Sequence, residues 1–155
     1  MASLGDLLAP ERVRAGVLVP NKKALLQQLG QISAESLALP ARDVTERLLE
    51  REKLGSTGFG GGVAIPHGRM PGIGAVSGIF ARLAQPIDYG AVDGAPVDLV
   101  FLLLSPEGAG AEHLKALARV SRQLRDSTFT AKLRGAGSPD ALFALLVPAE
   151  ARGAA

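Results

Sequence analysis

A nearly continuous apolar run at residues 97–104 (VDLVFLLL) constrains the fold of this chain more than any other feature. A strand with one face in water would carry a polar residue at about every second position. A run interrupted only by Asp98 is instead typical of a strand that is covered on both faces. The sequence therefore predicts a sheet with further elements packed on each side of it.

Helical and extended patterns surround this run. Helices are predicted at residues 22–38 with Asn21 as N-cap, from Pro40 onward, and at 111–125, 128–134 and 140–146, the last with Ser138 as cap and Pro139 at its first position. Further strands are predicted near residues 13–19, at 63–65 and at 75–83. This order predicts an α/β sandwich, with a mixed central sheet flanked by helices. We expect one domain over residues 1–155, with its core at about 4–148, because the length suits one ordinary core.

Composition excludes several classes of function. The chain has no cysteine, which rules out thiol catalysis, disulfides and cysteine-bound zinc. The net charge is only +2, and no dense Lys/Arg run supports nucleic-acid binding. No apolar run approaches the roughly 20 residues that span a bilayer, so we expect no membrane insertion. The N-terminus lacks the layout of a signal peptide, which predicts a cytoplasmic protein.

The segment with the most unusual composition is the glycine-rich stretch at residues 55–62 (GSTGFGGG). It leads into a short apolar strand and then into Pro66, His67 and Gly68. Glycine permits close approach of a ligand to the backbone, and proline fixes the chain just before the histidine. A neutral imidazole held there can serve as a nucleophile, a base or a metal ligand. A partly buried, hydrogen-bonded histidine is an equally good interpretation of the local pattern.

Two further positions are candidates for the same chemistry. His113 lies in the first turn of its predicted helix, where unpaired N–H groups favour anions. It is placed at the edge of an apolar side formed by Leu114, Leu117, Val120 and Leu124. Arg51 ends a helix just before the glycine-rich stretch, where a guanidinium can clamp a phosphoryl oxygen, and Thr57 adds a hydroxyl. Taken singly, these residues are better explained as an ordinary edge histidine and a solvated arginine at a helix end.

Common site motifs are absent. The glycine-rich stretch is not followed by Gly-Lys-Ser/Thr, so it is not a P-loop, and it misses the spacing of a dinucleotide-binding turn. The chain contains neither a nucleophile elbow nor a His-Glu-x-x-His motif. The two histidines, 46 residues apart, make a zinc site possible, but nothing in the sequence requires one.

Taken together, the motifs resemble those of the IIA proteins of the bacterial phosphoenolpyruvate-dependent phosphotransferase system, of the fructose/mannitol type and its nitrogen-regulatory branch. The segments that carry the resemblance are 4–13 (LGDLLAPERV), 51–58 (REKLGSTG), 62–68 (GVAIPHG), 86–88 (PID), 92–94 (VDG), 96–97 (PV) and 113–118 (HLKALA). The similarity extends over nearly the whole chain. Three glycines at 60–62 replace the charged or amide residue that many relatives carry there.

The resemblance implies that His67 is the phosphorylated residue and that His113 and Arg51 support the phosphoryl group. It also implies a histidine-phosphorylated carrier protein as the donor. From the residues themselves, we expect Thr57, Gly58 and Gly68 to contribute to phosphate binding. No cofactor and no metal are implied. The expected function is a regulatory phosphotransferase component whose phosphorylation state governs its partners, such as transport systems or sensor kinases.

Two alternatives to this function remain open. The chain is also compatible with a sugar-specific IIA component that passes phosphate to a IIB domain. The other alternative belongs to a different functional class: it is a binding module whose histidine pocket transfers no phosphoryl group. The presence of all three expected site residues argues against that module.

Overall fold

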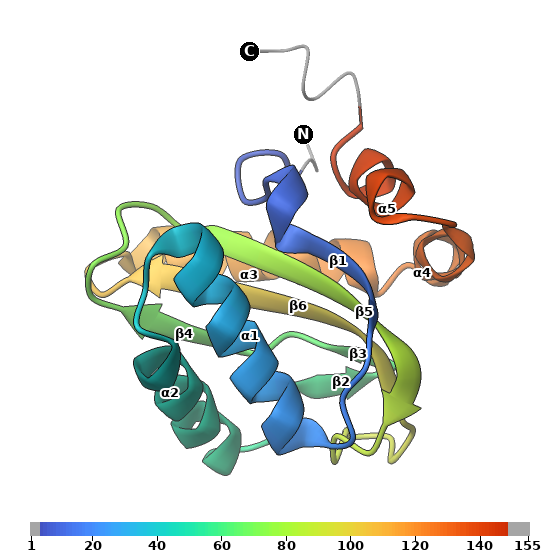
Figure 1. Ribbon diagram of the computed structural model, residues 1–155, viewed down its shortest axis with the longest axis horizontal. Helices are drawn as coiled ribbons and strands as arrows, with labels where there is room; N and C mark the ends of the chain where they lie inside the picture. Colours follow the sequence, from blue (N-terminus) through green and yellow to red (C-terminus); the bar gives the residue numbers. More distant parts are fainter. Residues whose placement is uncertain (1–3, 149–155) are drawn as a thin grey trace.

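The computed structural model describes residues 4–148 and contains six strands and five α-helices in that range. The strands are β1 (Val13–Val17), β2 (Gly58–Gly60), β3 (Val63–Ala64), β4 (His67–Met70), β5 (Ser77–Ile87) and β6 (Val97–Pro106). The helices are α1 (Lys22–Leu37), α2 (Ala41–Lys53), α3 (Gly110–Leu124), α4 (Ser127–Gly135) and α5 (Pro139–Leu146), after a short 3-10 turn, η1 (Pro10–Arg12). Figure 1 shows their arrangement.

The strands form one mixed sheet with β6 near its middle. The order is β1-β5-β6-β3-β2, and β4 pairs with β6 beyond the end of β3. Strand β5 is antiparallel to β6, whereas β3 and β4 are parallel to it. Strand β1 lies parallel to β5. The predicted α/β sandwich with a mixed sheet is confirmed.

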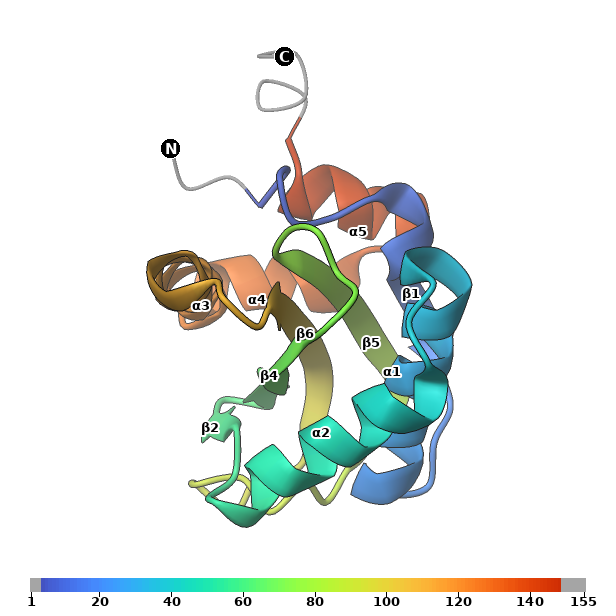
Figure 2. The same cartoon turned by 90° about the vertical axis from the view of Figure 1, so that its left-hand side faces the viewer.

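Strand β6 is buried on both of its faces, as its apolar run predicts. Val100, Leu102 and Leu104 belong to the core cluster that includes α1 and α2. Leu99, Phe101 and Leu103 belong to a second cluster, with α3, α4 and α5. All six side chains have an exposed fraction of 0%. Figure 2 shows the resulting three layers, with the sheet between the two groups of helices.

A break in the sheet places His67. Strand β3 pairs with β6 as far as Ala64, and β4 resumes the same parallel pairing at His67 opposite Leu103. Pro66 lies in the interruption, where it has no N–H to give, and its carbonyl accepts from the backbone N of Leu103 at 3.0 Å. The imidazole is therefore carried by the first residue of a strand fixed to the central strand of the sheet.

The local signals for helix ends are also confirmed. The side chain of Asn21 accepts from the backbone N of Ala24, and that of Ser138 accepts from the backbone N of Ala141. Gly30 lies in the middle of α1 because a Cβ there would clash with the Thr45 hydroxyl and the Ala41 carbonyl of α2. These two helices therefore pack closely, which fixes the end of α2 beside the sheet.

Two expectations need correction. Strands β2 and β4 were not foreseen, since neither is long or strongly apolar. Leu114, assigned above to the apolar side of α3, is 64% exposed, because the buried side begins at His113 and continues through Ala116, Val120 and Leu124. His113 is thus part of that buried side and does not lie at its edge.

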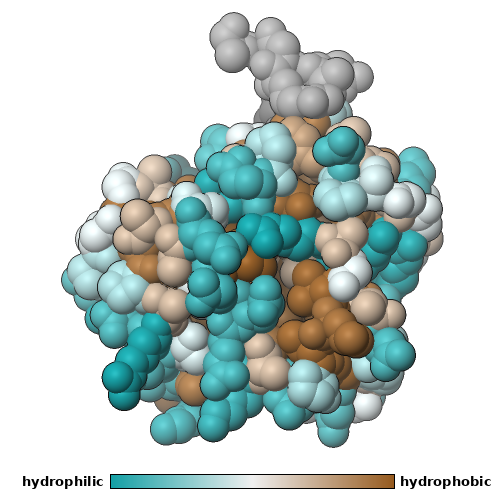
Figure 3. Space-filling model, viewed as in Figure 1, coloured by the Kyte–Doolittle hydropathy of each residue, from teal (hydrophilic) through white to brown (hydrophobic). Residues whose placement is uncertain are grey.

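The surface in Figure 3 is mainly hydrophilic, with one apolar patch over β1, the edge strand of the sheet. Leu18, directly after β1, is 72% exposed. Among the helices within residues 4–148, none has both the length and the apolar character needed to cross a bilayer.

Candidate functional site

A surface pocket of about 450 Å³ lies where α2, β4 and α3 meet. Figure 2 shows β4 between these two helices. The pocket is lined by four of the residues that the sequence predicts for phosphate chemistry. They are Arg51, His67, His113 and Gly68, and the first three carry the functional side chains. One of these three comes from each layer of the fold, because Arg51 is carried by α2, His67 by β4 and His113 by α3.

Two hydrogen bonds define the state of the His67 ring. Its Nδ1 lies 2.8 Å from the carbonyl oxygen of Ile65, which can only accept, so Nδ1 carries the proton. Its Nε2 lies 3.3 Å from Nε of Arg51, which can only donate, so Nε2 presents a lone pair. The two bonds independently require the same neutral tautomer. The ring therefore offers Nε2 to the pocket as a base or a nucleophile.

The surroundings of His67 also keep it uncharged. Burial lowers the pKa of His67, and the nearby charges of Arg51 and Arg69 act in the same direction against the hydrogen bond to Ile65. A histidine with a lowered pKa is largely neutral at neutral pH. The lone pair on Nε2 is thus available without any prior loss of a proton.

Arg51 is aimed at His67 by a second hydrogen bond. Its Nη1 donates to the carbonyl of Gly55 at 3.0 Å, while its Nε faces the imidazole. Gly55 has φ of +143°, a conformation that L side chains rarely adopt, so glycine is required at this turn. The end of α2 and the following turn thus hold the guanidinium in place.

His113 reaches the pocket from α3 and is only 5% exposed. Its ring centroid lies 5.6 Å from that of His67. Its Nδ1 is 2.6 Å from the hydroxyl of Ser105, at the end of β6. Burial lowers the pKa of His113, and Arg69 and His67 lower it further. The second histidine is therefore neutral as well.

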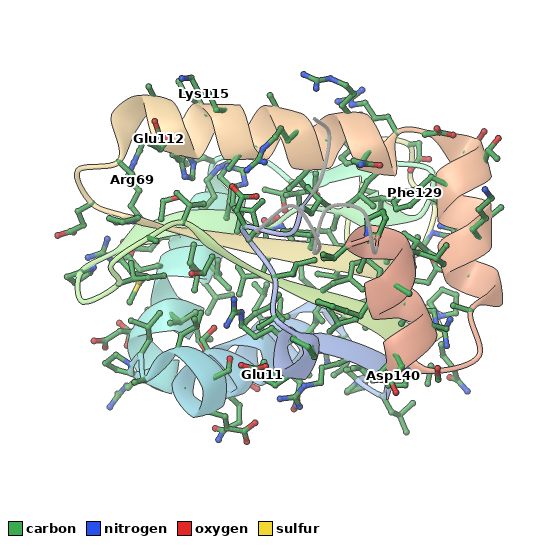
Figure 4. The ribbon with its side chains drawn as sticks, turned by 90° about the horizontal axis from the view of Figure 1, so that it is seen from above. Glu11, Arg69, Glu112, Lys115, Phe129 and Asp140 are labelled. Carbon is green, nitrogen blue, oxygen red and sulfur yellow. The ribbon has the colours of Figure 1, made fainter. Side chains whose placement is uncertain are left out.

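Further cations surround the two rings. Arg47 and Arg69 line the pocket, and Arg47 donates to the carbonyl of Arg69 at 2.9 Å. Figure 4 shows Arg69 at the same end of the molecule as Glu112 in the first turn of α3. Arg47 also lies 3.4 Å from Glu107. The pocket thus combines neutral imidazoles with a positive rim, which suits a bound anion.

Thr57 and Gly58 do not line this pocket. The Thr57 hydroxyl donates to Glu52 and lies 2.9 Å from the Tyr89 hydroxyl, and Thr57 is 8% exposed. Gly58 is buried with its α-carbon facing Ala91 and Tyr89. The structure therefore does not bring these two residues to the pocket where phosphate binding was expected of them.

The buried cluster around Thr57 and Glu52 is the part of the site that sequence reasoning missed. Glu52 accepts from Lys22 at 2.8 Å and from the backbone N of Thr57 at 3.1 Å. Lys22 also lies 4.2 Å from the ring centre of Tyr89. Burial alone would raise the pKa of Glu52, but the hydrogen bonds from Lys22 and Thr57 outweigh it and lower that pKa. A charged residue on a polar helix gives no sequence signal that it is buried, so only the fold reveals the cluster.

The triple glycine also lies outside the pocket. The backbone N of Gly61 donates to Asp93 at 3.1 Å, and its carbonyl accepts from Arg134 at 2.8 Å. Its amide is therefore bonded elsewhere and does not face His67. Within residues 4–148, no group of three metal-ligating side chains is placed to hold an ion.

Comparison with known proteins identifies the family. The family model described as "Phosphoenolpyruvate-dependent sugar phosphotransferase system, EIIA 2" matches residues 6–147. The chain therefore belongs to this family of phosphotransferase components. It is 52% identical over 141 residues to a nitrogen regulatory protein of Bradyrhizobium diazoefficiens, covering 91% of this chain and 92% of that one. It is 40% identical to the nitrogen regulatory protein of Escherichia coli, covering 95% and 91%.

Solved structures show the same fold. The nitrogen regulatory protein IIA-Ntr of Neisseria meningitidis matches with a TM-score of 0.86 and 39% identity, covering 93% of this chain and 99% of that one. IIA mannitol of Escherichia coli matches with a TM-score of 0.76 at 20% identity, covering 90% and 99%, which supports the fold alone.

Proposed function

We propose that this chain is a regulatory phosphocarrier that accepts a phosphoryl group on Nε2 of His67 from a histidine-phosphorylated carrier protein. The phosphorylation state of His67 then determines which partner proteins the chain binds. The observation that carries the proposal is the pair of opposed hydrogen bonds on His67. They leave the Nε2 lone pair in the pocket, beside the guanidinium of Arg51.

The transfer step needs no net proton movement. The Nε2 lone pair of His67 forms a bond to phosphorus as the phosphorus–nitrogen bond of the donor breaks, and that electron pair returns to the donor imidazole. The acceptor ring, which keeps its proton on Nδ1, becomes a cation, while the cationic donor ring becomes neutral. The Ile65 carbonyl faces the Nδ1–H at 2.8 Å, so its dipole stabilises the charge that develops on His67.

Arg51 has two roles in this step. Its Nε must leave the Nε2 lone pair when phosphorus arrives, and its guanidinium then faces the phosphoryl oxygens. A phosphoryl group adds about −1.5 to −2 charge. At about 4 Å and an effective dielectric near 20, one arginine offsets roughly 4 kcal/mol per unit charge before desolvation. Phosphoryl transfer depends mainly on such positioning and charge stabilisation.

Exposed apolar side chains at the rim of the pocket favour partner binding that depends on the phosphorylation state. Leu54 and Leu114 both line the pocket and are 83% and 64% exposed. Apolar side chains beside a group that gains two negative charges form a surface whose partners differ between the two states. Relatives with 40% to 52% identity carry the name nitrogen regulatory protein, which favours regulation as the use of this surface.

Intact-mass measurement tests the acceptor. The protein is incubated with phosphoenolpyruvate, the first enzyme of the system and its carrier protein, and the mass is read in mild alkali. The chain has two histidines, so His67→Gln and His113→Gln together cover every phosphohistidine position. We expect His67→Gln to abolish the added phosphoryl mass and His113→Gln to slow its appearance. Full labelling of the His67→Gln variant would overturn the proposal.

Arg51 provides the matched pair of variants. Arg51→Lys keeps the charge but loses the planar donor that faces Nε2, whereas Arg51→Ala loses both. We expect the rate to fall by about 10²-fold in Arg51→Ala and by less in Arg51→Lys. Transfer of the label from the protein to a sugar in membrane extracts would instead assign the sugar-specific role.

A further inference from the structure

The two imidazoles of the pocket are held by chemically different partners. His67 is bonded through Nδ1 to a backbone carbonyl, that of Ile65. His113 is bonded through Nδ1 to a hydroxyl, that of Ser105, at 2.6 Å. Ser105 is 0% exposed and is paired through β6 with Arg69 of β4, so its position is fixed by the sheet. Unlike a carbonyl, a hydroxyl can donate or accept, so the direction of this second bond has to be derived.

Burial decides that direction. In the part of the chain that the structure describes, the Ser105 hydroxyl has no second hydrogen-bond partner besides His113. If the ring donated Nδ1–H to this oxygen, the hydroxyl proton would be left unpaired in the interior, which is costly. If the hydroxyl donates to Nδ1, both the hydroxyl proton and the Nδ1 lone pair are satisfied. The proton of the neutral His113 ring then resides on Nε2.

We propose that Ser105 is a positioning residue that holds His113 as the Nε2–H tautomer, opposite to the tautomer of His67. One ring then presents a lone pair to the pocket and the other presents a proton. The first attacks phosphorus, and the second donates a hydrogen bond to an oxygen of the phosphoryl group. This inference rests on the proposed function for its part in transfer, whereas the tautomer of His113 follows from the hydrogen bonding alone.

The assignment also explains why only one of two neighbouring histidines is the acceptor. The ring centroids are 5.6 Å apart and both rings line the same pocket. Burial lowers the pKa of both, so charge does not distinguish them. The lone pair of His113 is on Nδ1 and is directed at the buried hydroxyl of Ser105, whereas that of His67 is on Nε2 beside Arg51, which also lines the pocket. Only His67 has a pyridine-type nitrogen facing the incoming phosphorus.

Nitrogen NMR of the histidine rings tests this directly. Protein labelled with ¹⁵N-histidine is examined by long-range ¹H–¹⁵N correlation, which separates N–H nitrogens from pyridine-type nitrogens. We expect the proton of His113 on Nε2 and that of His67 on Nδ1 in the wild type. A wild-type His113 that carries its proton on Nδ1, or populates both forms, would overturn the proposal whatever the variants do.

Variants then link the tautomer to transfer. Ser105→Ala removes the donor, so we expect the Nδ1–H form of His113 to appear and the phosphorylation rate to fall about tenfold, with the His67 spectrum unchanged. Ser105→Thr keeps a hydroxyl and should restore the Nε2–H form. Ser33→Ala is the matched control, because Ser33 is also 0% exposed but bonds to the Leu29 carbonyl within α1. It should change neither the tautomers nor the rate.

The outcomes separate the two proposals. A wild type with the expected tautomers that takes no phosphoryl group would overturn the proposed function. A phosphorylated wild type whose Ser105→Ala variant keeps both its His113 tautomer and its rate would overturn the role of Ser105 alone.

Discussion

The glycine-rich segment of residues 55–62 is anchored by charged side chains at both ends, with a buried carboxylate at one end and a partly exposed ion pair at the other. At the end near the pocket, the buried carboxylate of Glu52 accepts from Lys22 and from both the backbone N and the hydroxyl of Thr57. The other end is the turn at Gly61 between the antiparallel strands β2 and β3, the hairpin tip. There Arg134 forms an ion pair with Asp98 at 2.8 Å and donates to the Gly61 carbonyl. The Glu52 side chain is 6% exposed, whereas those of Arg134 and Asp98 are 36% and 22% exposed.

Among the described residues, only the buried end is connected to the site by hydrogen bonds. From the buried end, the Thr57 carbonyl accepts from the backbone N of Ile65 at 3.1 Å, and the Ile65 carbonyl fixes the His67 ring. The same turn supplies the Gly55 carbonyl that holds Arg51. No comparable connection leads from the hairpin tip to the pocket among residues 4–148. The charges that lie farthest from solvent thus position the site, and the exposed ones secure a turn.

The largest effect is expected from removing the buried carboxylate. Glu52→Ala leaves the Lys22 ammonium and both Thr57 donors without their acceptor, so we expect a loss of roughly 3–5 kcal/mol in the free energy of unfolding. Urea unfolding measures it. Phosphorylation of the folded variant should also slow, because the turn that holds Arg51 loses its anchor. A variant within about 1 kcal/mol of the wild type would show that the cluster is not the stronger anchor.

A smaller effect is expected from pH. The pKa of Glu52 is lower in the folded chain than its ordinary value of 4.5. The folded state therefore gains stability from this group above pH 4.5, and that gain is lost as the pH falls through the lower, folded pKa. Urea unfolding across the acid range should show a shallower loss of stability in Glu52→Gln than in the wild type. Parallel curves would contradict the assignment.

The smallest effect is expected at the hairpin tip. Asp98→Asn weakens a partly exposed ion pair, so the free energy of unfolding should fall by about 1 kcal/mol or less, and the loss should shrink in high salt. The phosphorylation rate should stay at the wild-type value. A rate that falls as far as in Glu52→Ala would show that both ends of the segment serve the pocket equally.

The fold was largely predictable because its strongest signals are local or periodic. The apolar run at residues 97–104 defines the central strand, and the caps Asn21 and Ser138 define two helix starts. Strands β2 and β4 were not predictable, because their few residues become strands only through pairing with neighbours. The exposure of Leu114 was misjudged because the buried side of α3 includes a polar residue, His113, that pattern reasoning places outside it.

The site was predictable only in part. Arg51, His67 and His113 were selected from their motifs, and the structure brings them together at one pocket. Thr57 was assigned to the phosphate because a hydroxyl in a glycine-rich stretch suits that role, yet it is bonded to Glu52 and Tyr89. Glu52 and Tyr89 are buried and meet partners that lie about 30 residues away along the chain. Ser105 is buried beside His113, and the sequence displays neither arrangement.

The proposed function requires that the phosphoryl group be bonded to one particular nitrogen, and NMR of the phosphorylated protein identifies that atom. With ¹⁵N-labelled histidine, the coupling between ³¹P and the ring nitrogens identifies both the residue and the nitrogen. We expect phosphorus on Nε2 of His67, with the proton retained on Nδ1. Phosphorus on Nδ1 of His67, or on either nitrogen of His113, would contradict it.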